Sequence, residues 1–202
     1  MSKIEVNEIV NQSGDNDSGI DLTTNDQIGF KIANASKWTL NSSGNLFPSS
    51  TSQGIVLGAT SDTSANRLDD YEEGTWTPEI IGDGGNSGQA YQLQQGSYTK
   101  TGRQISCMFF IRFQTEGSFS GSYLRLSGFP FTIKATPQTV HLTAIYFANL
   151  GDNYISLGAQ AYEGTNSAFI WGKKSATTSR EYLGTSDLTN ATDLSGSFIY
   201  NI

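Results

Sequence analysis

The chain has 202 residues, of which 19 are acidic and 12 basic, giving a formal net charge of -7. This balance is unsuited to nucleic acid or anionic lipid, and no stretch approaches the roughly 20 apolar residues that span a bilayer. We therefore expect neither nucleic-acid binding nor membrane insertion. With 22 glycines and only 15% charged residues, the composition is typical of short strands joined by tight turns.

Residues 1–67 are polar and turn-rich, with apolar residues spaced singly. Apolar and polar residues alternate at residues 27–32, 38–40 and 54–58, which predicts short strands. So few apolar residues per strand would leave an apolar face in water, and burial against copies of the same chain removes that cost. We interpret residues 1–67 as a thin β-stalk of a homo-oligomer.

Residues 68–81 differ in character from both flanks. Asp69, Asp70, Glu72 and Glu73 are crowded into five positions, and the segment TWTPEII follows at residues 75–81. This pattern predicts a junction made of a solvated hinge and then a strand.

Residues 82–202 begin with a glycine-rich loop and then become more apolar and aromatic. The clearest strand covers residues 103–113, where Ile105, Cys107 and Phe109 fall on one face by the two-residue period. Further strands are predicted at residues 122–126, 139–147, 154–161, 168–172 and 197–202. Turn residues separate them at intervals typical of a β-sandwich, so we predict an all-β fold with an antiparallel sandwich or jelly roll at the C-terminus.

Three segments resemble tail-fibre and other virion proteins of tailed bacteriophages. They are LDDYEEGTWTP at residues 68–78, YTKTGRQI at residues 98–105 and LSGFPFT at residues 126–132. The family usually has Gly-Leu-Pro-Phe in the third segment, so Phe129 is a departure. GIVLG at residues 54–58 and the opening MSKIEVNEI are similar to such fibres as well.

The resemblance implies a non-enzymatic virion protein, made in the infected bacterial cytoplasm and working as a homotrimer. Residues 1–20 would attach to another protein of the tail or capsid. The C-terminal domain would bind a glycan or protein of the host surface, and no cofactor is expected.

Three alternatives remain open. The first is a head fibre or capsid decoration protein with the same β-domain. The second is a small glycan-degrading tailspike that uses a carboxylate pair of the junction, since glycoside hydrolysis requires two carboxyl groups about 5 to 9 Å apart. The third, a secreted carbohydrate-binding module of cellular origin, is disfavoured by the single cysteine and by an N-terminus without the apolar run of a signal peptide.

The sequence offers little for metal or nucleophilic chemistry. His141 is the single histidine, and Cys107 alternates with predicted core residues, so we expect neither a catalytic nor a metal site. The numerous tyrosines and tryptophans are compatible with sugar stacking, although most are expected in the core or in interfaces. The predicted receptor contact is the cluster Trp171, Lys173, Lys174 and Arg180.

Overall fold

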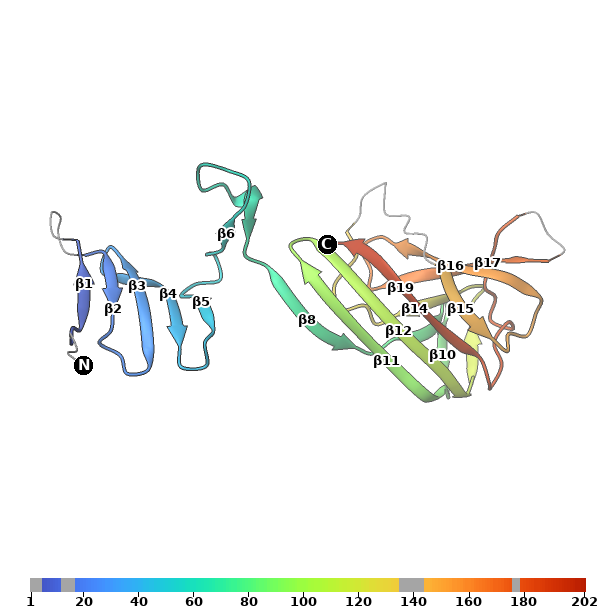
Figure 1. The fold of residues 1–202 in the computed structure, drawn as a ribbon. Coiled ribbons are helices and arrows are strands. Elements are labelled where there is room, and N and C mark those ends of the chain that lie inside the picture. Colours follow the sequence, from blue (N-terminus) through green and yellow to red (C-terminus); the bar gives the residue numbers. More distant parts are fainter. Residues whose placement is uncertain (1–4, 12–16, 135–143, 176–178) are drawn as a thin grey trace. The chain divides into compact units, whose positions relative to one another are not determined.

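The computed structural model describes residues 5–11, 17–134, 144–175 and 179–202 (Figure 1). It divides into two compact units, Met1–Asp70 and Tyr71–Ile202. The boundary lies three residues after residue 67, at which the predicted stalk ends. Apart from one turn of 3-10 helix at Ser64–Asn66, all regular structure in the described residues is β, and no helix there is long and apolar enough to cross a membrane.

The first unit contains a five-stranded antiparallel meander and a small hairpin. The meander strands pair in chain order: β1 (Glu8–Val10), β2 (Gly19–Asp21), β3 (Gln27–Ile32), β4 (Ala35–Asn41) and β5 (Leu46–Pro48). The hairpin joins β6 (Ile55–Val56) to β7 (Arg67–Leu68). The strands predicted at 27–32, 38–40 and 54–58 are present, whereas β1, β2 and β5 are too short to show an alternation.

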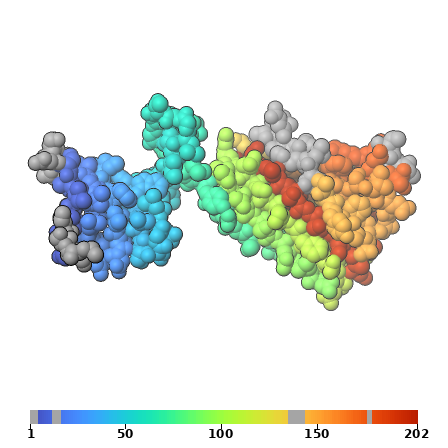
Figure 2. All heavy atoms as spheres, in the orientation of Figure 1, coloured from blue at the N-terminus to red at the C-terminus, as the bar shows by residue number. Residues whose placement is uncertain are grey.

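The second unit is built on one ten-stranded antiparallel sheet. Its strands follow the order β8 (Tyr71–Trp76), β11 (Ala90–Thr101), β12 (Gln104–Thr115), β19 (Asp193–Asn201), β15 (Ala144–Ala148), β16 (Tyr154–Tyr162), β17 (Ser167–Lys174), β14 (Leu124–Ser127) and β9 (Glu79–Gly82), with β18 (Glu181–Tyr182) beside β17. A separate pair joins β10 (Gly85–Ser87) to β13 (Ser118–Ser120). In the space-filling view, β11 and β12, β19 and the strands that follow lie side by side on the surface (Figure 2).

The connection between β8 and β9 requires this sheet to curl. The two strands stand at opposite ends of the strand order, yet only residues 77–78 separate them. Because so short a connection spans only about 10 Å, the sheet must roll until its two edges approach each other. The all-β antiparallel prediction is confirmed, but one continuous curled sheet takes the place of the two separate sheets expected of a sandwich. The single strand predicted at 75–81 is wrong, because the buried Pro78 lies at the corner between two strands.

The core occupies the inner face of the curled sheet. On β12, the predicted alternation is confirmed: Ile105, Cys107 and Ile111 are fully buried, whereas Met108 on the opposite face is 60% exposed. The described part of the strand predicted at 139–147 is β15, and residues 135–143 lie outside the described residues.

Two of the segments that resemble phage fibres meet where the sheet closes. The Trp76 ring packs edge-on against Phe129, with ring centroids 5.3 Å apart. Gly128 has a φ of +88°, and a Cβ atom at this position would collide with the carbonyl oxygen of Thr77. A larger residue at position 128 would therefore force the two segments apart.

The third segment packs beside them. The Tyr98 hydroxyl on β11 donates a hydrogen bond to Glu72 on β8. The Tyr98 ring packs edge-on against Phe131 at 5.4 Å, and the Lys100 ammonium lies 5.3 Å from the centre of the same Phe131 ring. The three segments, far apart in the sequence, thus form the seam that closes the curled sheet.

Candidate functional site

A group of aromatic side chains lies on the outer face of β14, β17 and β18. On β17, Ala168 and Ile170 are buried at 3% and 1% exposure and point toward the core. Because successive side chains of a strand alternate between faces, Phe169 and Trp171 project outward. The register places Tyr182 of β18 opposite Trp171.

These rings form one connected cluster, which we call the aromatic platform. Phe169 is at its centre: its ring centroid lies 5.0 Å from that of Tyr162, 5.3 Å from Tyr182 and 6.5 Å from Tyr123. Tyr123 and Tyr162 are each 42% exposed. The platform consists of Tyr123, Tyr162, Phe169 and Tyr182 together with Trp171, which is joined to Tyr182 through the Arg180 guanidinium that lies over both rings.

Two guanidinium groups lie over the platform. The Arg125 Cζ is 5.3 Å from the Tyr162 ring centre and 5.7 Å from that of Phe169. The Arg180 Cζ is 5.7 Å from the Trp171 ring centre. These distances are within the range of cation–π attraction, so both cations are held against the aromatic surface.

The platform also contains buried polar atoms without hydrogen-bond partners. They are Arg125 Nε, Gln160 Oε1 and Trp171 Nε1. Arg125 and Gln160 stand on either side of Phe169 in the strand register. A buried polar group left unpaired costs about 1 to 3 kcal/mol, so two donors and one acceptor are concentrated where pairing with a ligand would be favourable.

The four predicted contact residues do not all lie on the same face of the sheet. Trp171 and Arg180 are in contact, and Lys173 is exposed two positions beyond Trp171 on the same strand. Lys174 belongs to the other face of β17: its Nζ lies 2.7 Å from Asp152 and 3.4 Å from Glu181. The hydrogen bond to Asp152 raises the pKa of Lys174. Lys174 therefore has a role in local ion pairing rather than on the platform.

Arg125, Gln160 and Phe169 were missed by the sequence-based prediction. Phe169 shares the two-residue period with Trp171, and Arg125 lies between the buried Leu124 and Leu126, so alternation places both on an outer face. Gln160 has no comparable signal, because only the pairing of β16 with β17 brings it beside Phe169.

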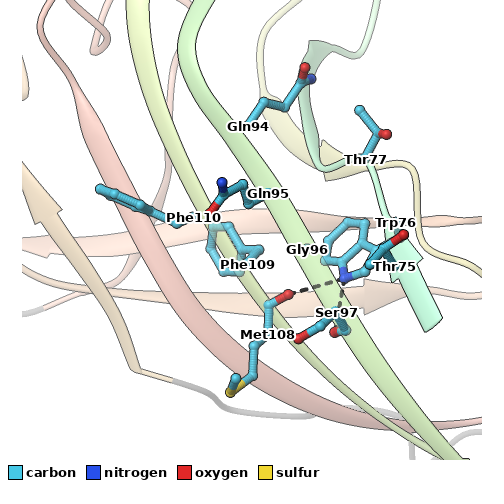
Figure 3. Close-up of a pocket in the computed structure, with 10 residues that line it drawn as sticks. All are labelled: Thr75, Trp76, Thr77, Gln94, Gln95, Gly96, Ser97, Met108, Phe109 and Phe110. Carbon is cyan, nitrogen blue, oxygen red and sulfur yellow. Dashed lines mark hydrogen bonds between the residues drawn. The ribbon is translucent and has the colours of Figure 1, made fainter. Parts of the chain in front are cut away.

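A concave surface lies elsewhere in the second unit, over β8, β11 and β12 (Figure 3). It is a shallow hollow of about 620 Å³, lined by Thr75, Trp76, Thr77, Gln94, Gln95, Gly96, Ser97, Met108, Phe109 and Phe110. None of these residues has an ionisable side chain. The Trp76 indole N–H donates to the carbonyl oxygens of Ser97 and Met108, at 3.2 and 3.1 Å, and the Arg112 guanidinium lies 5.5 Å from the Phe110 ring centre. The side chains that line the hollow therefore offer a ligand no charge, and the indole N–H of Trp76 is already hydrogen-bonded.

Two of the four junction carboxylates, Glu72 and Glu73, lie on opposite faces of one strand. Glu72 and Glu73 are consecutive residues of β8 and project to opposite faces. Glu72 accepts a hydrogen bond from Tyr98 and Glu73 accepts one from Tyr71. Asp69 lies 3.8 Å from Arg67. Glu72 and Glu73 therefore do not face each other as the two carboxyl groups of glycoside hydrolysis must.

The described residues offer little for nucleophilic catalysis or metal binding. Cys107 is fully buried, and burial raises its pKa to about 12, which suppresses the reactive thiolate. In the described part of the chain, no group of three His, Cys, Asp or Glu residues is arranged to hold a metal ion. His141 lies outside the described residues.

Comparison with known proteins adds no relative. No family model, no curated protein and no solved structure matches the chain. The functional argument consequently depends on the surfaces described above and on the sequence resemblance.

Proposed function

We propose that the chain is a non-enzymatic fibre protein of a bacteriophage virion, a homotrimer whose C-terminal unit binds a host-surface glycan through the aromatic platform. Residues 1–20 would attach the stalk to a tail protein. The observation that carries the binding function is the coincidence on one outer face of aromatic rings, two guanidinium groups and three unpaired polar atoms.

The chemistry of this face fits a carbohydrate better than a purely apolar ligand. The C–H faces of a sugar ring pack on aromatic rings, and its hydroxyl groups both donate and accept hydrogen bonds. Arg125 Nε and Trp171 Nε1 supply donors, and Gln160 Oε1 supplies an acceptor. Because all three atoms are buried, the side chains that cover them would have to move to admit a hydroxyl group.

Three copies of a weak site would suit an adhesin. A face on the outside of a curled sheet encloses little of a ligand, so the affinity of a single site is expected to be low. Linking three such sites in one particle raises the overall avidity without any new contact.

The virion assignment is supported by the sequence resemblance, and a binding role without turnover is supported by the carboxylate geometry. The three resembling segments pack into one seam, so their residues have a shared structural purpose. Glu72 and Glu73 project to opposite faces, which disfavours the glycan-degrading alternative.

Binding is tested with surface polysaccharides of candidate host bacteria immobilised on a sensor. We expect Trp171→Ala and Arg125→Met each to weaken binding at least tenfold. Tyr146→Ala is the matched control, because Tyr146 is an exposed tyrosine of the same sheet outside the platform. Unchanged binding in both platform variants would exclude this site, and release of new reducing ends would favour the glycan-degrading tailspike.

The location is tested by cryo-electron microscopy of intact particles. Threefold density on the tail is the expected result. Density on the capsid would assign the chain to head fibres or decoration proteins, and absence from purified particles would overturn the virion proposal.

A further inference from the structure

One face of the five-stranded meander in the first unit is apolar across every strand. Residues that oppose one another in a sheet place their side chains on the same face. The register gives one uninterrupted row: Ile9 opposes Ile20, Ile20 opposes Phe30, Phe30 opposes Trp38 and Trp38 opposes Pro48.

A second row runs beside the first. Ile28 opposes Leu40, and Leu40 opposes Leu46. Each of these residues is two positions from a member of the first row along its own strand, so the two rows share one face. We call this face the apolar sheet face: Ile9, Ile20, Ile28, Phe30, Trp38, Leu40, Leu46 and Pro48.

The opposite face has a different chemistry. It carries Glu8 and Lys31, whose carboxylate and ammonium groups lie 2.6 Å apart, together with Asp21 and Thr39. Phe47 also projects from this face, opposite Thr39. None of the eight residues of the apolar sheet face is charged.

The first unit does not cover its own apolar face. In residues 5–11 and 17–70, no large apolar side chain is buried, and Ile9, Phe30 and Leu46 are 55%, 41% and 56% exposed. The exposed apolar area of this face is on the order of 500 Å² per chain, a large part of the roughly 800 Å² that each partner contributes to a standard interface. A single-layer sheet of this kind requires a second apolar layer.

We propose that the apolar sheet face is buried between copies of this chain, about the axis of the homotrimer on which the proposed function rests. A face without charges is compatible with a copy of itself, since no like charges are brought together. Glu8 and Lys31 pair with each other on the opposite face, so this ion pair does not call for a charged partner on the apolar sheet face.

The test uses the full-length chain and two phenylalanines of the same sheet. Phe30 lies on the apolar sheet face and Phe47 on the opposite face, and their exposures are 41% and 43%. By sedimentation velocity, we expect Phe30→Asp to raise the dissociation constant of the assembly at least a hundredfold and Phe47→Asp to leave it within threefold of the wild type. An assembled Phe30→Asp variant, equal dissociation of both variants, or a monomeric wild type would overturn the proposal.

A labelling measurement tests the same proposal without the Phe30→Asp and Phe47→Asp substitutions, which could themselves prevent folding. Leu46→Cys and Phe47→Cys place thiols on opposite faces at neighbouring, exposed positions, while the native Cys107 is fully buried. In the assembled protein, we expect maleimide to modify Cys at position 46 at least tenfold more slowly than at position 47. Equal rates would contradict the inference. An assembled wild type that binds no glycan would overturn the proposed function but leave this inference intact.

Discussion

The strands of both units have an apolar face, but only the second unit buries that face with its own residues. Every buried large apolar side chain in the described residues belongs to residues 71–202, whereas the first unit leaves Ile9, Phe30 and Leu46 uncovered by its own residues. The second unit has strands of up to 12 residues in a sheet that curls until its ends meet at the seam. The strands of the first unit have at most seven residues. Alternation therefore specifies that a strand has an apolar face, and the curl of the sheet determines whether the chain itself can cover that face.

The largest expected effect sharpens this contrast in the core. Ile111 on β12 is fully buried, and Ile111→Ala should lower the free energy of unfolding of the second unit by about 2 to 5 kcal/mol, because it leaves a cavity. Urea denaturation followed by circular dichroism and tryptophan fluorescence measures this loss. Ile55→Ala in the first unit is the control: Ile55 lies in the separate hairpin, outside the apolar sheet face, and is 57% exposed, so the unfolding transition of the second unit should be unchanged. A similar loss in both variants would show that the two units unfold together.

The next effect tests the seam that distinguishes the second unit. Gly128→Ala introduces strain at a positive φ and a collision with the Thr77 carbonyl oxygen, so we expect a loss of about 2 to 4 kcal/mol. Gly164→Ala is the matched control, because Gly164 also has a positive φ, +71°, but no heavy atom lies within 4 Å of the place that its Cβ atom would occupy. We expect this control to lose only about 1 kcal/mol. If Gly128→Ala and Gly164→Ala lose the same free energy of unfolding, measured by heat or urea, the close contact of Gly128 with Thr77 does not contribute to stability.

The smallest expected effect is a pH-dependent change in stability from the ion pair of Arg112 and Asp193. The hydrogen bonds from Arg112, at 2.7 and 2.8 Å, lower the pKa of Asp193. A carboxyl group with a lowered pKa in the folded state stabilises the protein above its unfolded pKa of about 3.9 and loses that contribution as the pH falls through the folded value. We expect Asp193→Asn to be less stable than the wild type at pH 6 and to approach it below pH 3. A constant difference across this range would exclude a role for the Asp193 charge.

Several elements were predictable because they depend on local pattern alone. The strand at 27–32 and the inward face of β12 follow from the two-residue period. β11, a 12-residue strand, was not among the predicted strands, since Gln94, Gln95 and Gly96 interrupt any alternation. Its position depends on a neighbour: a Cβ atom on Gly96 would lie 2.5 Å from the Trp76 indole nitrogen.

The aromatic platform illustrates what sequence reasoning reaches and where it stops. Trp171 and Arg180 are close in the sequence and have suitable chemistry, and they are in contact. Arg125 and Gln160 come from distant strands and join the same face only because β14 and β16 both pair with β17.

The sequence by itself determined the all-β class, the alternating faces of the longer strands and the polar, core-poor character of the N-terminal third. These properties depend on residue type and on spacing along one strand. Only the tertiary structure decided that one sheet curls to a seam, that Lys174 pairs with Asp152, and that three unpaired polar atoms lie among aromatic rings. Strand pairing and register place residues that are remote in the chain within a few ångströms, and single-strand periodicity contains no information about that choice.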